Sequence, residues 1–177
     1  MSLEQDTSSP IPPAHEIVLV PPPGNQHRQH LLDQCINVRI DVFVHEQGFP
    51  LDVEVDANRH DPTAAHFLLR LVPSLTPIGT IRAHKVEGTD YYKLSRLAIL
   101  KLYRRYHLGR DLVLALHEWV KGDAMQSGQL EVAKVVCHSQ IAVKPFYSKY
   151  GYQPQGDEFD EDGGPHQKMV AYLPLRS

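Results

Sequence analysis

The sequence predicts a mixed α/β protein in which helices flank one central sheet. Short β-rich segments bounded by turn residues alternate with two longer segments whose apolar residues recur every three or four positions. That alternation is typical of a sheet packed against helices. At 177 residues the chain fits one domain, and we expect a flexible tail over residues 1–13 followed by a single domain over residues 14–177.

The composition argues against a membrane-spanning, secreted or nucleic-acid-binding protein. The chain is 42% hydrophobic and 22% charged, and no apolar run approaches the ~20 residues that a membrane-spanning helix needs. The first residues lack the basic start and apolar stretch of a secretory signal. Cys35 and Cys137 are too few for a disulfide framework, so we expect reduced thiols and a cytoplasmic location, with the nucleus left open. A net charge of -3 argues against a nucleic-acid partner.

The first half of the chain predicts one strand, one helix and then three strands. The segment EIVLV (16–20) is a first strand, and an amphipathic helix follows from about Gln26 until Gly48 and Pro50 end it. The segments HFLLRLV (66–72), IGTIRAHKV (78–86) and YYKLSRLAI (91–99) are separated by turn residues. They predict an antiparallel meander.

The second half predicts a crossover. A helix begins at Gly109 and ends near Gly128, a strand covers residues 131–138, a short helix lies within 141–150, and residues 167–173 form a closing strand. A strand, helix and strand in this order make a right-handed crossover, which places the turn before the helix at the carboxyl end of the sheet. Anionic ligands commonly bind there.

The turn in LYRRYHLGRDLVLAL (102–116) has the chemistry of a phosphate site. A helix that opens at Gly109 exposes free backbone N–H groups, and Arg104, Arg105 and Arg110 add positive charge. Gly109 would also let a pyrophosphate approach the main chain. A basic helix cap that binds nothing explains the turn equally well.

This turn resembles the coenzyme A pyrophosphate loop of the GNAT acetyltransferases, with Arg104, His107 and Gly109 at the loop's key positions and His107 where the family has a glycine. A second segment, SQIAVKPFYSKYGY (139–152), resembles the GNAT helix that carries Phe-Tyr and ends at a glycine-aromatic pair. The resemblance implies a mixed, mostly antiparallel twisted sheet of about seven strands with about four helices. It also implies acetyl-coenzyme A as the cosubstrate and no metal.

Further segments resemble the ElaA-like branch of the family. They are VRIDVFVHEQGFPLDVEVD (38–56), His66, Gln140 with Phe146-Tyr147, and EDGGPHQKM (161–169). From these resemblances we expect the coenzyme to contact Leu97, Ala98, Ile99, Arg104, Arg105, Tyr106, His107, Leu108, Gly109, Arg110, Gln140, Phe146 and Tyr147. The strand residues 97–99 would supply oxyanion-binding N–H groups.

The resemblance makes Tyr147 the general acid that protonates the leaving thiolate, although an isolated helical tyrosine is more often a core residue. An amine acceptor must also lose a proton. Candidate bases are Glu46, Glu54, Asp162, His66 and His166. We expect His166 and Glu46 in catalysis, and Glu54, His66 and Asp162 in binding the acceptor.

Two interpretations stay open for each of three sequence features. The acidic stretch from Asp157 to Asp162 is either a solvated loop or an attractor of the cationic acceptor. Arg39 either pairs with a carboxylate such as Glu46 or Asp56, which we favour, or contacts a substrate carboxylate. Cys137 either packs as a small hydrophobe, which we favour, or forms a covalent intermediate.

We therefore expect an N-acetyltransferase that moves acetyl from acetyl-coenzyme A to a primary amine of a small molecule, by direct attack in a ternary complex. A polyamine, an amino sugar, a lysine side chain and an arylamine all satisfy this chemistry. The alternatives are a protein lysine or N-terminal acetyltransferase and a non-catalytic module that senses the coenzyme. We expect no membrane partner, and a homodimer stays open.

Overall fold

The computed structural model describes residues 9–54 and 59–176. Most of the expected tail, residues 1–8, and the expected Arg39 partner Asp56 lie outside the described residues. Among those described, eight strands form one sheet in the order β1-β2-β3-β4-β5-β8-β6, and β7 pairs with β8 beside this path. The mixed sheet with flanking helices is thus confirmed, with eight strands instead of about seven.

The strands follow the predicted order. They are β1 (His15–Leu19), β2 (Ala65–Leu71), β3 (Pro77–Lys85), β4 (Tyr92–Ile99), β5 (Val132–Gln140), β6 (Gln153–Pro154), β7 (Phe159–Glu161) and β8 (Gly164–Pro174). The antiparallel meander is confirmed, because β2 pairs with β3 and β3 pairs with β4 in antiparallel register. The acidic stretch from Asp157 to Asp162, for which a solvated loop was one of two readings, contains β7, which pairs with β8.

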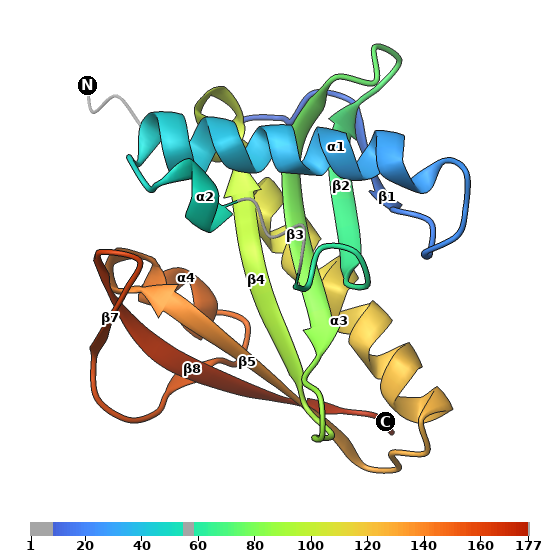
Figure 1. Cartoon of the computed structure of the whole chain (residues 1–177), viewed down its shortest axis with the longest axis vertical. Helices are drawn as coiled ribbons and strands as arrows, with labels where there is room; N and C mark the ends of the chain where they lie inside the picture. Colours follow the sequence, from blue (N-terminus) through green and yellow to red (C-terminus); the bar gives the residue numbers. More distant parts are fainter. Residues whose placement is uncertain (1–8, 55–58, 177) are drawn as a thin grey trace, which may run out of the picture.

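Two helices cover opposite faces of the sheet (Figure 1). Helix α1 (Arg28–Arg39) crosses one face and continues as a π-helix over Ile40–Glu46, followed by the short α2 (Leu51–Glu54). Helix α3 (Leu108–Gln126) packs on the other face, and α4 (Lys144–Ser148) lies beyond the end of β5. The predicted helices are therefore present, with the first one ending in π geometry.

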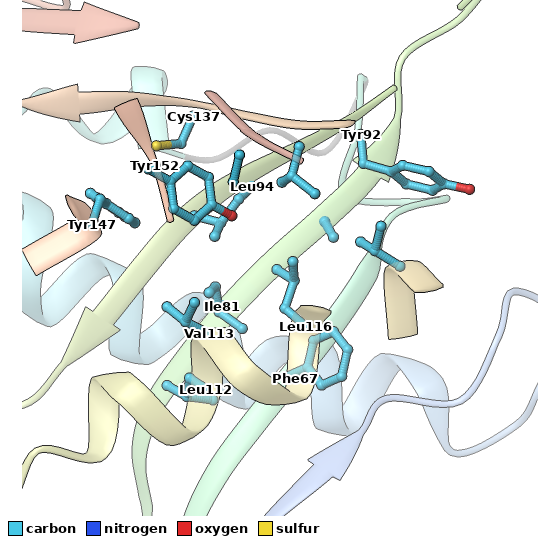
Figure 2. Packing of buried hydrophobic residues seen from close by; sticks show 14 of the residues in the cluster. Phe67, Ile81, Tyr92, Leu94, Leu112, Val113, Leu116, Cys137, Tyr147 and Tyr152 are labelled. Atoms are coloured by element: carbon cyan, nitrogen blue, oxygen red, sulfur yellow. The ribbon is translucent and has the colours of Figure 1, made fainter. Parts of the chain in front are cut away.

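The face under α3 holds the main hydrophobic core. Leu112, Val113 and Leu116 of α3 are fully buried against Ile81 of β3 and Leu94 of β4. Figure 2 shows this cluster extending toward Cys137, Tyr147 and Tyr152. Burying side chains of this size contributes roughly 1.5–3 kcal/mol each, so this face supplies much of the folding free energy.

Strands β4 and β5 form a fork (Figure 1). Their parallel pairing covers only Tyr92 with Val135 and Lys93 with Val136, and the two strands then separate toward their carboxyl ends. A bulge in β4 lies just past this point, where the register against β3 shifts and Arg96 has a φ of 56°. A bulge bends its strand, and the unpaired edge of β4 therefore opens toward the gap.

Candidate active site

The fork opens into a cavity of about 770 Å³ that both faces of the sheet help to line. Leu94 and Cys137 belong to the core under α3, whereas Lys93 and His138 are their immediate neighbours in β4 and β5. Because side chains alternate along a strand, Lys93 and His138 point toward the opposite face, the one on which α1 lies (Figure 1). The cavity therefore passes through the sheet.

At the carboxyl end of β4, α3 begins without a side-chain cap. Its N-cap residue, His107, makes no capping hydrogen bond and has a φ of 57°. This left-handed conformation favours glycine, the residue that the GNAT resemblance places at this position. The first N–H groups of a helix have no partner within the helix, so the start of α3 presents donors and the positive end of the helix dipole.

Arg104 does not point its guanidinium at this helix start. Its Nη1 and Nη2 donate to the two oxygens of Glu46 at 2.5 Å, and its Nε donates to the Ile99 carbonyl at 2.9 Å. The hydrogen bond from Arg104 is the main cause that lowers the pKa of Glu46. Arg104 and Glu46 therefore tie the π-helix to the end of β4.

Gly109 and Phe146, both expected to contact the coenzyme, lie against each other. A Cβ built on Gly109 would be 3.3 Å from Cζ of Phe146, which is a tight approach. The absence of a side chain at Gly109 thus lets α4 pack against the first turn of α3. Close packing of the Phe146 ring is therefore a reason for glycine at this position in addition to the expected approach of a pyrophosphate.

Tyr147 lies at the cavity wall, on the α3 side of the fork. The residue is 7% exposed, and burial is the main cause that raises the pKa of its phenol above the ordinary value. Cys137 is 2% exposed, and burial raises the pKa of its thiol to about 12. At neutral pH the phenol is therefore protonated and the thiol is not a thiolate.

Two histidines line the opposite part of the cavity. Nδ1 of His138 donates to Oε1 of Glu161 at 2.9 Å, and Nδ1 of His166 donates to the Gly164 carbonyl at 2.8 Å. Because carboxylate and carbonyl oxygens only accept, each Nδ1 carries a proton. When these imidazoles are neutral, their Nε2 atoms are therefore the basic positions.

Behind this part of the cavity lies a buried group of charges. Arg39 is 0% exposed and pairs with Glu54 through its Nε at 2.5 Å and with Asp61 through its Nη1 at 2.9 Å. Arg82 also pairs with Asp61, at 2.8 Å. The expected ion pair of Arg39 is therefore present, but its expected partner Glu46 is wrong, because Arg104 holds that carboxylate.

His66 belongs to the same buried group. It is 0% exposed, its Nε2 donates to the Asp61 carbonyl at 3.0 Å, and burial is the main cause that lowers its pKa to about 4. Two of the candidate bases, His66 and Glu46, do not line the cavity. Neither is placed to receive a proton from a bound acceptor.

The expected site residues thus fall into two groups. Those that line the cavity are Glu54, Leu97, Gln140, Tyr147, Asp162 and His166. The others surround the start of α3 or are buried, as are Ala98 and Ile99. Among the described residues, the cavity lining holds eight more with acid, base or charge chemistry that were not expected as individual site residues: Asp52, Arg59, His60, Arg82, Lys93, Arg96, His138 and Glu161. Of these, Glu161 belongs to the acidic stretch for which attraction of the acceptor was one reading.

A signal for the position of Glu161 is present in the sequence. Asp162 and Gly163 both have positive φ, of 53° and 85°, and connect Glu161 to Gly164 across a two-residue turn. An Asp-Gly pair between strands is typical of a hairpin turn. This pair would have predicted β7 and its pairing with β8, with Glu161 opposite Gly164.

Within residues 9–54 and 59–176, no group of three or more His, Cys, Asp or Glu side chains is arranged to hold a metal ion. Across the same residues, no helix has the length and apolar character required to cross a membrane.

The chain matches known acetyltransferases in sequence and in fold. Residues 43–173 match the family model of the acetyltransferase (GNAT) domain. The protein BSU40680 of Bacillus subtilis (strain 168), provisionally named an acetyltransferase, is 35% identical over 139 residues, which cover 78% of this chain and 88% of that protein.

Two crystal structures share the fold. One is a Lactobacillus plantarum protein provisionally named an N-acetyltransferase, with a TM-score of 0.72 and 29% identity, covering 90% of this chain and 99% of that one. The other is Escherichia coli ElaA, with a TM-score of 0.67 and 20% identity. The match covers 89% of this chain and 97% of ElaA. The family match, the close relative and the fold agree, and the chain belongs to the GNAT family of acetyltransferases.

Proposed function

We propose that the protein transfers acetyl from acetyl-coenzyme A to the primary amine of a small molecule, by direct attack within a ternary complex. The observation that carries this proposal is the cavity through the β4–β5 fork. A thioester held on the α3 side and an amine held on the α1 side would meet inside it. The proton donor for the thiolate would then lie on the α3 side, and the bases that accept the proton of the amine would lie on the α1 side.

The start of α3 fits the diphosphate of the coenzyme. Its uncapped N–H groups and positive dipole end favour a phosphate anion. Arg105 and Arg110 are exposed beside it, so their charge is available without breaking a buried ion pair. The edge of β4 past Lys93 lacks pairing with β5 and offers main-chain groups to the pantetheine arm.

Tyr147 is the proton donor for the leaving thiolate. Attack by an amine expels sulfur as an anion, and a phenol within the cavity can protonate it. The buried position of Tyr147 keeps its proton in place until negative charge develops. Its contribution therefore arises in the transition state, where it raises turnover more than binding.

The acceptor arrives as an ammonium ion and must lose a proton before it attacks. Nε2 of His166 and Nε2 of His138 are the two basic positions at the cavity wall. Glu161 orients the ring of His138 and stabilises the imidazolium that forms, as a carboxylate does when it accepts from Nδ1 of a general base. Glu46 is left with a structural role through Arg104.

Cys137 is not the nucleophile in this scheme. A buried thiol with a pKa of about 12 carries almost no thiolate at neutral pH, and the thiolate is the reactive form. The amine therefore attacks the thioester itself, and no acetyl-cysteine forms.

Measurement of free coenzyme A thiol tests both parts of the proposal. With acetyl-coenzyme A and a panel of amines, we expect amine-dependent thiol release and intersecting initial-velocity patterns, with turnover retained by Cys137→Ala. Parallel patterns together with inactive Cys137→Ala would indicate a covalent intermediate. No thiol release with any amine would contradict the proposed activity.

A further inference from the structure

The charges on the α1 side of the cavity are divided between two walls. One wall, formed by β3 and β4, carries Arg82, Lys93 and Arg96, and the adjoining α2 adds the carboxylates of Asp52 and Glu54. The facing wall, formed by the end of β5 and by β7 and β8, carries Glu161, Asp162 and the two histidines. Two charged walls across one acceptor cavity point to an acceptor that is itself charged at two places.

Arg96 reaches the cavity from the bulge in β4. Its Nε is 3.4 Å from Oε1 of Glu54, and this buried nitrogen makes no hydrogen bond to any described residue. Glu54 is shared, because the same Oε1 accepts from Nε of Arg39 at 2.5 Å. The charge of Arg96 is therefore only partly compensated within the described protein.

Lys93 lies next along the same wall. It is half-buried, and within the described ranges its ammonium forms neither an ion pair nor a hydrogen bond. Burial is the main cause that lowers its pKa, and Arg82, Arg96 and Arg59 lower it further against the opposing charge of Glu161. A cation in this position gains stabilisation from an anion that enters the cavity.

We propose that the acceptor carries a carboxylate in addition to its amine, with the carboxylate bound by Lys93 and Arg96 and the ammonium directed toward Glu161 and His138. This inference rests on the proposed function and names the substrate class of the same site. An arginine fork and a lysine ammonium donate charge-assisted hydrogen bonds to a carboxylate. A doubly charged phosphate fits less well, because Glu54 and Glu161 also line the cavity and would repel it.

Matched pairs of acceptors test this inference. Glycine is compared with glycinamide, L-lysine with L-lysinamide, and β-alanine with O-phosphoethanolamine and ethanolamine. For each acceptor, kcat/KM is measured by thiol release, and binding to the protein saturated with coenzyme A is measured by calorimetry. We expect the carboxylates to exceed their neutral partners by at least about tenfold, which is the usual scale of one good charged contact.

Lys93→Met should reduce this carboxylate preference several-fold, since the ammonium is lost while the stem volume is kept and Arg96 alone still contacts the carboxylate. The matched control Lys85→Met removes an exposed lysine at the end of β3 and should retain the full preference. Circular dichroism at 25 °C establishes that both variants are folded.

The outcomes separate the inference from the proposed function. Equal rates and equal binding for carboxylates and neutral partners would overturn the inference while acetyl transfer stands, and so would a preference for O-phosphoethanolamine over β-alanine. If no acceptor in the panel reacts, binding of the acceptors to the coenzyme-saturated protein tests the inference instead. A binding preference for carboxylates that is reduced several-fold in Lys93→Met then supports it, and equal binding overturns it. Failure to bind acetyl-coenzyme A would instead remove the proposed function.

Discussion

The two faces of the sheet differ in what they bury. Under α3, side chains such as Ile81, Leu94 and Leu116 form an apolar core. Under α1, smaller apolar clusters that include Leu32 and Leu68 share the interface with buried charges. The adjacent positions of the same strands carry Arg82 and Lys93, and α1 itself contributes the fully buried Arg39. An apolar face is the simpler way to stabilise a fold, so the charged face indicates a region shaped for binding as well as stability.

The sharpest test of this comparison is the removal of the carboxylate at the centre of the charged face. Asp61→Asn leaves Arg39 and Arg82 without their shared anion, and loss of one partner from a buried pair typically costs about 3–5 kcal/mol. Leu116→Ala on the apolar face should cost about 2–5 kcal/mol. Urea unfolding measures both changes.

Asp157→Asn, at an exposed position, is the matched control for the charge change and should leave the free energy of unfolding within about 0.5 kcal/mol. A loss below about 1 kcal/mol for Asp61→Asn would show that the charged face is not held together by its ion pairs.

Acid should weaken both faces, because each buries a neutral histidine. Burial lowers the pKa of His66 under α1 and of His117 in α3 to about 4. The unfolded chain therefore binds more protons than the folded one between about pH 6.5 and pH 4, and stability falls as the pH falls through that window. The expected loss is about 3 kcal/mol for each histidine.

Urea unfolding at several pH values from 7 to 4 measures this loss. His117→Gln should roughly halve the pH dependence, since the amide can still bond to Tyr152 but does not titrate. His30→Gln, at an exposed position on α1, should leave the pH dependence unchanged. An unaltered slope in His117→Gln would exclude the α3 face as a source of acid sensitivity.

Tyr147 lies at the cavity wall on the α3 side of the fork, and its hydroxyl is the group that the mechanism uses. Tyr147→Phe should lower kcat by about 100-fold or more, because a general acid contributes on this scale. The dissociation constant for acetyl-coenzyme A should change by less than about threefold, since the hydroxyl acts as the thiolate leaves. Steady-state kinetics and calorimetry check the two values, and unchanged turnover would remove Tyr147 from the mechanism.

The smallest expected effect concerns Arg104, which the sequence analysis placed on the phosphates. The pair with Glu46 is partly exposed, at 40% and 33%, so Arg104→Gln should cost no more than about 1 kcal/mol of stability. Its effect on acetyl-coenzyme A affinity should be similar to that of Glu46→Gln, because both variants break the Arg104–Glu46 pair and only the Nε contact of Arg104 with the Ile99 carbonyl differs. A tenfold weaker affinity in Arg104→Gln alone would show that the guanidinium does reach the phosphates.

These comparisons explain which features the sequence could predict. Local periodicity and turn residues predicted the meander, the α3 helix and the crossover, because each depends on neighbouring residues. The contacts of Arg39 with Asp61 and of His138 with Glu161 join residues 22 and 23 positions apart, and no local pattern determines which carboxylate pairs with which base. The position of Arg104 was missed for the same reason, since Glu46 is 58 positions away.

Calorimetric titration of folded protein with acetyl-coenzyme A tests the central claim most directly. The account predicts saturable uptake of one coenzyme per chain, because the open start of α3 and the unpaired edge of β4 offer one site for the diphosphate and the pantetheine arm. Absence of any binding heat and any thermal stabilisation, in protein shown to be folded, would contradict it.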